Sequence, residues 1–378
     1  RGEMWSEHEG FPVLVEGGIP GELVEAEVIR RYPEHFAALV TRVLEPSRDR
    51  VDPPCPYFGP CTGCQWQHVR YERQLRFKRE MVEKTLSGSP ALAAVEVKRA
   101  LASPETLGYR NHARFTVGRR EGEVGYVNAI TRRFLRVDHC LLMHDSINEV
   151  LTGTQTRLKG MTQFSVRVGI NTGDRIIQPA LPEGIEEFPS GQKRLRESLC
   201  GREFRVAGSS FFQVNTRQAE RMAGLVRERL DLKGDETLVD AYAGVGVFAV
   251  LMAHSAGRVI AIEDSPSAVE DARANAEGLD NVEFVLGRTE DVLGQIQGPV
   301  DAVILDPPRA GCHPEVIDAV KRQAPVRVVL ISCDLTALQR DLERLCEGGE
   351  FTMDHVQPVD MFPQTRHIEN VSLLRRSG

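Results

Sequence analysis

Long hydrophobic runs are missing from this sequence of 378 residues. No stretch holds the roughly 18 or more consecutive apolar residues that mark a membrane-spanning helix, so the sequence predicts no transmembrane segment. The first residues, Arg1-Gly2-Glu3-Met4-Trp5, also lack the apolar core of a secretory signal. We therefore expect a cytoplasmic protein that does not act on a membrane. Position 1 is Arg rather than Met, so a trimmed or shortened N-terminus stays open.

Cysteine is scarce as well, and positive charge is in the minority. Eight cysteines are too few for the disulfide scaffold of a secreted protein of this length, so metal-binding or catalytic roles are considered first. The net charge of -7 argues against nucleic-acid binding over the whole surface. Residues 51–140, however, hold 15 Lys and Arg against nine Asp and Glu. This excess favours either a local phosphate-binding face or simply a solvated helix face.

The hydrophobic pattern divides the chain into four parts. Residues 1–45 alternate apolar and polar positions in short stretches, which predicts a small antiparallel sheet or barrel. Residues 46–54 have the composition of a linker. Residues 55–200 combine a cysteine cluster, an amphipathic helix near 69–86 and then short strands. Residues 201–378 change to an alternation of helices and strands.

The C-terminal part predicts a doubly wound α/β fold. A helix is expected to begin near Thr216, and another to be capped by Ser265 with Pro266 as its first residue. Strands separated by helices require a parallel sheet that is covered on both faces. Five such strands are expected, at Thr237–Asp240, Arg258–Glu263, Val282–Leu286, Val300–Asp306 and Arg327–Ser332.

The first two of these strands carry the pattern of a nucleoside-binding site. The first ends at Asp240 and continues into Gly244-x-Gly246-x-x-Ala249, where glycine lets a ligand approach the backbone closely. The second ends at Glu263, whose carboxylate can accept hydrogen bonds from a ribose. This pattern fits NAD as well as S-adenosylmethionine. Asp240 favours S-adenosylmethionine, whose ammonium group needs an anionic or polar partner.

Two further residues are expected at the same edge of the sheet, and Glu369 is a third candidate residue. Asp306, followed by Pro307-Pro308-Arg309, ends the fourth strand, and the two prolines aim it into the cleft. Cys333 follows the fifth strand and precedes a helix, whose N-terminal dipole favours thiolate. Glu369 stands at the start of a strand near the C-terminus rather than in a solvated helix, although a lone Glu is most often a surface charge.

A second group of candidate residues consists of sulfur ligands. Cys55-x5-Cys61-x2-Cys64 brings three thiols together, and the distant Cys140 can supply a fourth. Four sulfur ligands suit zinc or an iron–sulfur cluster, and the Cys61-x2-Cys64 portion alone favours zinc.

These motifs resemble those of a known family. The sequence is similar to the RNA 5-methyluridine methyltransferases of the RumA/TrmA type over essentially its whole length. The motifs that carry the resemblance occur in this order: Cys55-Pro-Tyr-Phe-Gly-Pro-Cys61-Thr-Gly-Cys64-Gln-Trp-Gln-His68, Phe211-Phe212-Gln213-Val214-Asn215, Asp306-Pro-Pro-Arg309, Ser332-Cys333-Asp334 and His367-Ile-Glu369-Asn-Val371.

The resemblance implies both an architecture and a site. It implies an N-terminal TRAM-like β-barrel, a β-rich central domain with a 4Fe–4S cluster on the four cysteines named above, and a C-terminal class I, Rossmann-like methyltransferase domain. It also implies that Cys333 is the nucleophile and Glu369 the base. The residues implied to contact S-adenosylmethionine are Gln213, Tyr242, Glu263 and Asp306.

The implied substrate is a uridine in structured RNA. A loop of 23S ribosomal RNA is favoured, and the T-loop of transfer RNA is the second possibility within the family. No obligate protein partner is implied. Two alternatives remain at this point: an NAD-dependent dehydrogenase, and an RNA-binding protein with an inactive methyltransferase domain.

Overall fold

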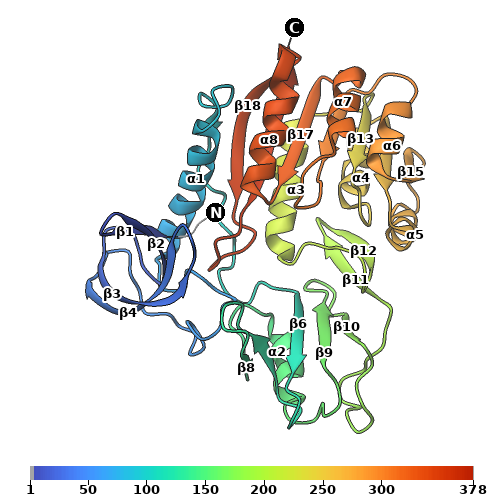
Figure 1. The fold of residues 1–378 in the computed structure, drawn as a ribbon. Helices are drawn as coiled ribbons and strands as arrows, with labels where there is room; N and C mark the ends of the chain where they lie inside the picture. The colour runs from blue at the N-terminus through green and yellow to red at the C-terminus, as the bar shows by residue number, and fades with distance from the viewer. Residues whose placement is uncertain (1–3, 378) are drawn as a thin grey trace.

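The N-terminal sheet opens the computed structural model, which describes residues 4–377 (Figure 1). Its order is β1-β2-β4-β3. The neighbours β1/β2 and β3/β4 are antiparallel, but β2 and β4 run parallel, so the sheet is not wholly antiparallel as the alternation predicts. The bounds are β1 (Trp5–His8), β2 (Phe11–Glu16), β3 (Leu23–Arg31) and β4 (Phe36–Glu45).

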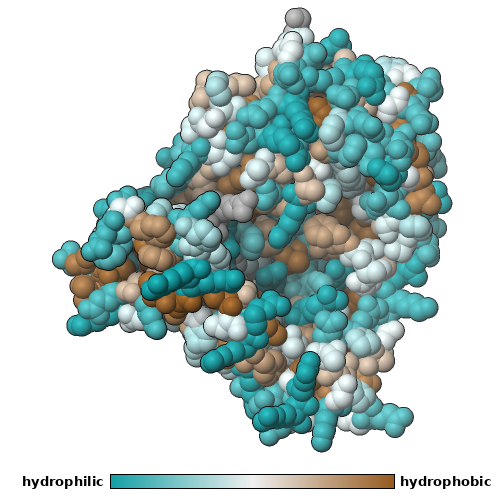
Figure 2. All heavy atoms as spheres, viewed as in Figure 1, coloured by the Kyte–Doolittle hydropathy of each residue, from teal (hydrophilic) through white to brown (hydrophobic). Residues whose placement is uncertain are grey.

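This sheet buries few of its own side chains and is tied to the chain that follows. Apolar side chains lie exposed over β3 and β4, at the left of Figure 2, with Leu23 and Val28 about half exposed. The Glu22 carboxylate accepts two hydrogen bonds of 2.6 Å from the guanidinium of Arg50. Arg50 also donates to the carbonyl of Gly17. Residues 46–54 are therefore fixed against the sheet.

The central sheet is antiparallel and has the order β10-β9-β6-β7-β8. Helix α2 (Asp145–Gly153) packs against β9, and apolar side chains such as Phe115, Leu151 and Phe164 fill the core between them. The strands are β6 (His112–Val117), β7 (Val124–Val127), β8 (Phe134–Arg136), β9 (Gln163–Val168) and β10 (Arg175–Gln178).

A two-stranded hairpin connects the central sheet to the C-terminal part. It pairs β11 (Arg194–Leu199) with β12 (Arg202–Ala207) through a two-residue turn. The buried carboxylate of Asp271 accepts hydrogen bonds of 2.8 Å from the side chains of Arg194 and Arg205. This ion pair fixes the hairpin to the helix that carries Asp271.

The C-terminal sheet has eight strands in the order β15-β14-β13-β16-β17-β19-β18-β5. The first five of these run parallel, as the sequence predicts, whereas β19 is antiparallel to both neighbours. The strand order reverses between β13 and β16, where doubly wound sheets bind ligands. The bounds are β5 (Glu96–Val97), β13 (Thr237–Ala241), β14 (Arg258–Glu263), β15 (Val282–Leu286), β16 (Ala302–Leu305), β17 (Arg327–Ser332), β18 (Phe351–Val359) and β19 (Glu369–Arg376).

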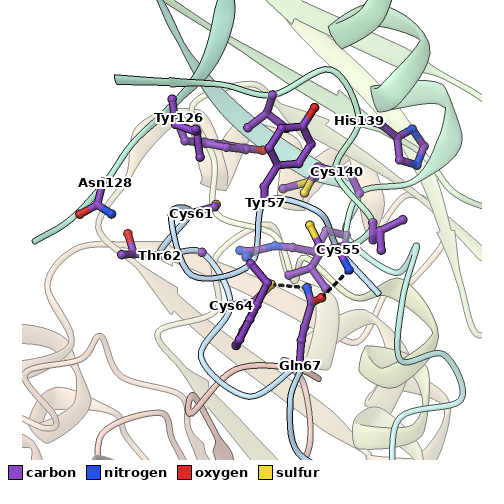
Figure 3. A pocket seen from close by; sticks show the side chains of 18 of the residues that line it. Cys55, Tyr57, Cys61, Thr62, Cys64, Gln67, Tyr126, Asn128, His139 and Cys140 are labelled. Atoms are coloured by element: carbon purple, nitrogen blue, oxygen red, sulfur yellow. Dashed lines mark hydrogen bonds between the residues drawn. The ribbon is translucent and has the colours of Figure 1, made fainter. Parts of the chain in front are cut away.

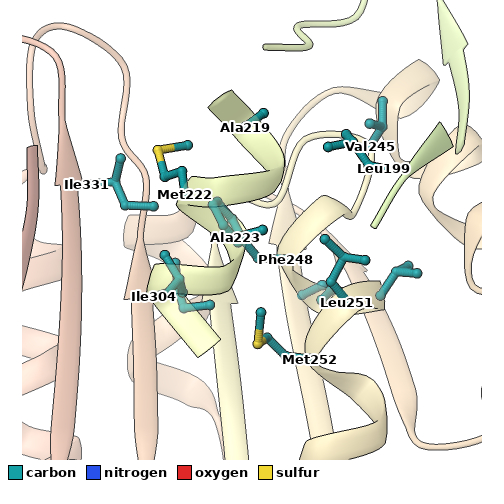
Figure 4. Packing of buried hydrophobic residues seen from close by; sticks show 14 of the residues in the cluster. Leu199, Ala219, Met222, Ala223, Val245, Phe248, Leu251, Met252, Ile304 and Ile331 are labelled. Carbon is teal, nitrogen blue, oxygen red and sulfur yellow. The ribbon is translucent and has the colours of Figure 1, made fainter. Parts of the chain in front are cut away.

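Helices cover both faces of this sheet, because its central strands carry almost only apolar residues. On one face, Met222 of α3 and Phe248 of α4 pack against Ile304 and Ile331 of the strands (Figure 4). Helices α1, α7 and α8 pack on the other face. The bounds are α1 (Tyr71–Ser87), α3 (Thr216–Leu230), α4 (Val247–Met252), α5 (Pro266–Asn275), α6 (Thr289–Val292), α7 (Pro314–Gln323) and α8 (Leu335–Cys346).

Two of these elements come from the earlier part of the chain. Helix α1 packs against α8 and β18, and β5 extends the sheet beyond β18 through the parallel pairs His355–Glu96 and Val356–Val97. The segment from 71 to 97 thus belongs to the C-terminal layers in space. Between residues 4 and 377, no helix is both long and apolar enough to span a membrane.

Candidate functional site

The glycine-rich loop after β13 is held by the carboxylate at the end of β14. Glu263 accepts a hydrogen bond from the backbone N–H of Gly244 (2.8 Å) and another from that of Ser265 (2.9 Å). Gly246 has a φ of 83°, and a Cβ there would lie 3.1 Å from the ring of Phe284. Only glycine fits this position without strain, so the loop stays open to a ligand.

Asp240 lies beneath this loop. Its carboxylate is fully buried and accepts a hydrogen bond of 2.8 Å from the backbone N–H of Ala249, in α4. Burial, together with the nearby charges of Asp306 and Glu263, raises the pKa of Asp240 to about 8 against the opposing effect of the hydrogen bond from Ala249. Asp240 therefore fixes the loop to the start of α4.

Of the other three residues implied to bind the cofactor, two directly follow strands at this edge of the sheet and the third precedes α3. Asp306 follows β16, and burial raises its pKa to about 7. Tyr242 is half-buried and adopts a left-handed backbone conformation with a φ of 67°. Gln213 is half-buried just before α3, and its carbonyl accepts a hydrogen bond of 2.9 Å from the side chain of Asn111.

Cys333 and Glu369 are brought together by the register of two antiparallel strands. The last pair of the β17–β19 ladder is Ser332 with Asn370. Cys333 follows Ser332 and Glu369 precedes Asn370, so the next residues along each strand face each other. Both lie at the edge of the sheet where Asp306 ends β16.

Burial and the neighbouring charges shift the pKa values of both Cys333 and Glu369. Burial, together with the charges of Glu369 and Asp306, raises the pKa of the Cys333 thiol to about 11, against the opposing charge of Arg309. Burial also raises the pKa of Glu369 well above its usual range, with Asp306 adding to the effect and Arg309 opposing it. The exposed Arg309 thus favours the ionised form of both groups.

The four cysteines of the second candidate site line one cavity of about 190 Å³ (Figure 3). All four are free thiols: Cys55, Cys61, Cys64 and Cys140. The side chain of Gln67 links two of them, because it donates to the sulfur of Cys64 (3.0 Å) and accepts from the backbone N–H of Cys55 (3.3 Å). Within residues 4–377, no three or more His, Cys, Asp or Glu side chains are grouped so that they could hold a metal ion as they stand.

The thiols of this cavity are shielded from water. Burial raises the pKa of Cys64 to about 12 and also raises those of Cys61 and Cys140. The neighbouring loop is fixed by Thr62, whose hydroxyl accepts a hydrogen bond of 2.8 Å from the backbone N–H of Ala129. The residues that line this cavity include none of the first candidate site. The two sites are therefore separate, one at the strand ends and one beside the central sheet.

Sequence reasoning missed a set of buried polar side chains beside the first site. Gln74 and Lys78 are fully buried on α1, which the sequence predicts only as an amphipathic helix. The signal that could have revealed them is two polar residues four positions apart on the side of the helix that also carries Phe77.

Known proteins resemble this chain in sequence and in fold. Residues 192–377 match the model of the tRNA (uracil-5-)-methyltransferase family. An uncharacterised RNA methyltransferase of Gloeobacter violaceus is 32% identical and covers 98% of this chain and 92% of its own length. One of Thermosynechococcus vestitus is 31% identical, covering 97% of this chain and 93% of its own length.

A solved structure shares the fold over nearly the whole chain. It is the tRNA (uracil-54, C5)-methyltransferase of Pyrococcus abyssi in complex with S-adenosyl-L-homocysteine, with a TM-score of 0.78 and 24% identity over 97% of both chains. Methyl transfer, rather than the hydride transfer of a dehydrogenase, is the chemistry of these relatives. The chain therefore belongs to the tRNA (uracil-5-)-methyltransferase family and is an RNA uracil-5-methyltransferase.

Proposed function

We propose that this enzyme transfers a methyl group from S-adenosyl-L-methionine to C5 of a uridine in structured RNA in the cytoplasm. A loop of 23S ribosomal RNA is the favoured substrate, and the T-loop of transfer RNA is the alternative. The observation that carries the proposal is the register of β17 and β19, which sets the thiol of Cys333 opposite the carboxylate of Glu369 at the ligand-binding edge of the sheet.

The cofactor is proposed to bind at the neighbouring strand ends. Glu263 uses one lone pair of each oxygen for the backbone, so each oxygen keeps a second lone pair for a ribose hydroxyl. Asp306 stands between this position and Cys333 along the edge of the sheet. We assign the cofactor contacts to Gln213, Asp240, Tyr242, Gly244, Gly246, Glu263 and Asp306, with Asp240 acting through the loop that it holds.

The proposed reaction begins with an addition to the ring. C5 of uracil is too weak a nucleophile to attack a methyl sulfonium unaided. The Cys333 thiolate adds to C6, and the electrons of the C5–C6 double bond move toward the C4 oxygen as an enolate. C5 of this enolate then attacks the methyl group, so that the C5–CH₃ bond forms while the S–CH₃ bond breaks.

Glu369 is proposed to complete the reaction. After methyl transfer, C5 still carries its proton, and the Glu369 carboxylate removes it. The electrons of the C–H bond restore the C5–C6 double bond and expel the Cys333 thiolate. A buried carboxylate with a raised pKa suits this step, because it is a stronger base than an exposed one.

The RNA must present an unstacked base to this site. Flipping a base out costs a few kcal/mol, and the cost is least in loops and single strands. We assign the phosphate contacts to the exposed Arg309 and to the basic residues between 51 and 140. A loop of structured RNA satisfies both requirements.

Glu369→Gln tests the function directly. Gln is nearly isosteric but cannot accept the C5 proton, so turnover should fall about 10²- to 10⁴-fold while a covalent enzyme–RNA adduct accumulates. The adduct is detected on denaturing gels after reaction with methyl-labelled S-adenosylmethionine and RNA from cells that lack the gene. Label in the adduct shows that the block follows methyl transfer.

The matched control for this experiment is Glu350→Gln. Glu350 is exposed and lies at the far end of the sheet, just before β18, so this variant should turn over normally. Normal turnover by Glu369→Gln would assign the base to another residue. Mapping 5-methyluridine in the reacted RNA identifies the molecule and the position.

A 4Fe–4S cluster is proposed for the second site, on Cys55, Cys61, Cys64 and Cys140. The donor set fits, because four thiolates are the usual cluster ligands. In a cluster each thiolate binds its own iron, whereas a zinc ion requires all four sulfurs around one point. Four thiols spread around one cavity therefore favour the cluster. When bound, it would supply the positive charge that these buried thiolates need.

Anaerobic purification tests the cluster. The protein should be brown and contain iron and acid-labile sulfide in equal amounts, whereas Cys64→Ser should lose most of both because it removes one of the four thiolate ligands. The control Cys200→Ser removes an exposed thiol away from the cavity and should keep the colour. A colourless protein that contains zinc would contradict the assignment.

The domain organisation is part of the proposal. We assign residues 1–45 to a TRAM-like barrel, 46–54 to a linker, 55–200 to a central iron–sulfur and RNA-binding domain and 201–378 to the methyltransferase domain. The separate four-stranded, five-stranded and eight-stranded sheets support this division except for α1 and β5, which come from the 55–200 part but lie in the C-terminal layers.

A further inference from the structure

The loop that leads into Glu369 is held by an unusual number of buried polar contacts. This Glu369 loop, residues 360–368, connects β18 to β19. In Figure 1 it extends from the C-terminal sheet toward α1 and the N-terminal part of the chain. The groups that contact it come from segments far away in the sequence. We name them the clamp: the side chains of Tyr71, Gln74, Lys78 and Tyr109 and the backbone N–H groups of Gln65 and Trp66.

Helix α1 supplies the polar face of the clamp. Tyr71, Gln74 and Lys78 are spaced by three and four residues, so they lie on one side of the helix. Tyr71 donates to the carboxylate of Asp360 (2.8 Å), and the ammonium group of Lys78 pairs with the same carboxylate. Lys78 also donates to the carbonyl of Phe362 (3.0 Å). These bonds fix the start of the Glu369 loop.

Gln74 and Gln364 form a reciprocal amide pair at the centre of the loop. The side-chain oxygen of Gln74 accepts from the backbone N–H of Gln364 (3.0 Å), and its amide nitrogen donates to the side-chain oxygen of Gln364 (2.9 Å). The same amide nitrogen donates to the carbonyls of Trp66 and Val69. Gln74 is completely buried, so no water can replace these bonds.

The conformation that this pair holds is a strained one. Gln364 has a φ of 68°, a left-handed conformation that residues other than glycine rarely adopt. Its carbonyl accepts hydrogen bonds from the backbone N–H groups of Gln65 (3.1 Å) and Trp66 (3.0 Å). Tyr109 adds a bond of 3.1 Å to the neighbouring carbonyl of Pro363. Such a conformation persists only where the surroundings impose it, and it is commonest beside functional sites.

We infer that the clamp sets the position of the Glu369 carboxylate relative to C5 of the substrate, and that Gln74 is its central positioning residue. Glu369 is five residues beyond Gln364, at the end of the clamped loop. Cys333 directly follows β17 and makes none of the contacts of the clamp. Loss of the clamp should therefore slow proton removal and spare the addition of the thiolate. This inference rests on the function proposed above.

The test is the fate of the covalent adduct in Gln74→Met, which keeps the length of the side chain but none of its hydrogen bonds. Single-turnover reactions use methyl-labelled S-adenosylmethionine and RNA from cells that lack the gene. Adduct formation should stay near the wild-type rate, whereas release of methylated RNA should slow by about 10- to 100-fold, the effect of a small displacement of a catalytic group.

Asn281→Leu is the matched control. Asn281 also donates two hydrogen bonds, which are partly buried, to the carbonyls of Ala253 (2.8 Å) and Ala256 (2.9 Å), but it precedes β15 at the opposite edge of the sheet. The Asn281→Leu variant should therefore be less stable than the wild type, but its rates of adduct formation and of product release should keep their wild-type ratio. Tyr109→Phe removes only one hydroxyl of the clamp and should slow release in the same direction but less.

Three results would overturn the inference. The first is a wild-type ratio of adduct formation to product release in Gln74→Met, and the second is an equal slowing of both steps in that variant. The third applies if Gln74→Met does not fold, and it is a wild-type ratio in Tyr109→Phe. Failure of the proposed function is recognised separately, because the wild-type enzyme would then form neither adduct nor 5-methyluridine.

Discussion

Cys333→Ala is expected to abolish both 5-methyluridine formation and the covalent adduct. Without the thiolate no enolate forms, and C5 of the uracil has too little electron density to attack the methyl group. Loss of a covalent nucleophile typically lowers turnover by roughly 10⁴-fold or more. The measurement is transfer of labelled methyl from S-adenosylmethionine to RNA, with a denaturing gel for the adduct.

Binding of S-adenosylhomocysteine separates loss of chemistry from loss of folding in this variant. Calorimetry should give near wild-type affinity, because Asp240, Glu263 and the glycine-rich loop are unchanged. Cys346→Ala is the matched control, since this half-buried free thiol at the end of α8 is absent from the site. Methylation retained by Cys333→Ala would remove Cys333 as the nucleophile, and the mechanism with it.

Lys78→Met is expected to destabilise the protein more than any other single change considered above. The ion pair of Lys78 with Asp360 has no exposed surface on either side chain. Removal of the cation leaves a buried carboxylate whose remaining side-chain donor is Tyr71. Breaking a buried ion pair from one side costs about 3–5 kcal/mol of the free energy of unfolding. The shift of the urea midpoint measures this cost.

A double variant distinguishes an uncompensated charge from lost packing. Lys78→Met combined with Asp360→Asn removes both charges and keeps an acceptor for Tyr71, so much of the lost stability should return. Lys98→Met breaks the exposed pair with Glu96 and should leave the urea midpoint unchanged. A midpoint close to wild type in Lys78→Met itself would show that the pair contributes nothing.

The central strands were predictable because a strand that is buried on both faces consists of a short run of apolar residues. The bounds of β14 and β17 agree with the sequence-based prediction, as do those of the edge strand β15 and the capping of α5 by Ser265. Strand β18 was not predicted, because it lies next to the edge and mixes apolar residues with Thr352, Asp354 and Gln357. Strand β5 has two residues, too few for any periodicity.

The site residues that lie at the ends of parallel strands were predictable. Asp240, Glu263, Asp306 and Cys333 each end or follow a parallel strand, so their shared edge could be deduced. The position of Glu369 opposite Cys333 depends on the antiparallel insertion of β19 beside β17, a long-range pairing that no local pattern encodes. The clamp was missed for the same reason, since its partners are up to 290 residues apart.

The long separation between α1 and its partners has a consequence for synthesis on the ribosome. Lys78 precedes Asp360 by 282 residues, so at about 5–20 residues per second the helix emerges tens of seconds before its counter-ion does. Phe77 can pack on Trp66 and Val69, which precede the helix, but throughout that interval Val82 and Leu86 lack the C-terminal strands and helix α8 that they pack on in the finished protein. We therefore expect chaperones that shield hydrophobic segments to engage this stretch, and the enzyme to become active only after its last strand leaves the exit tunnel.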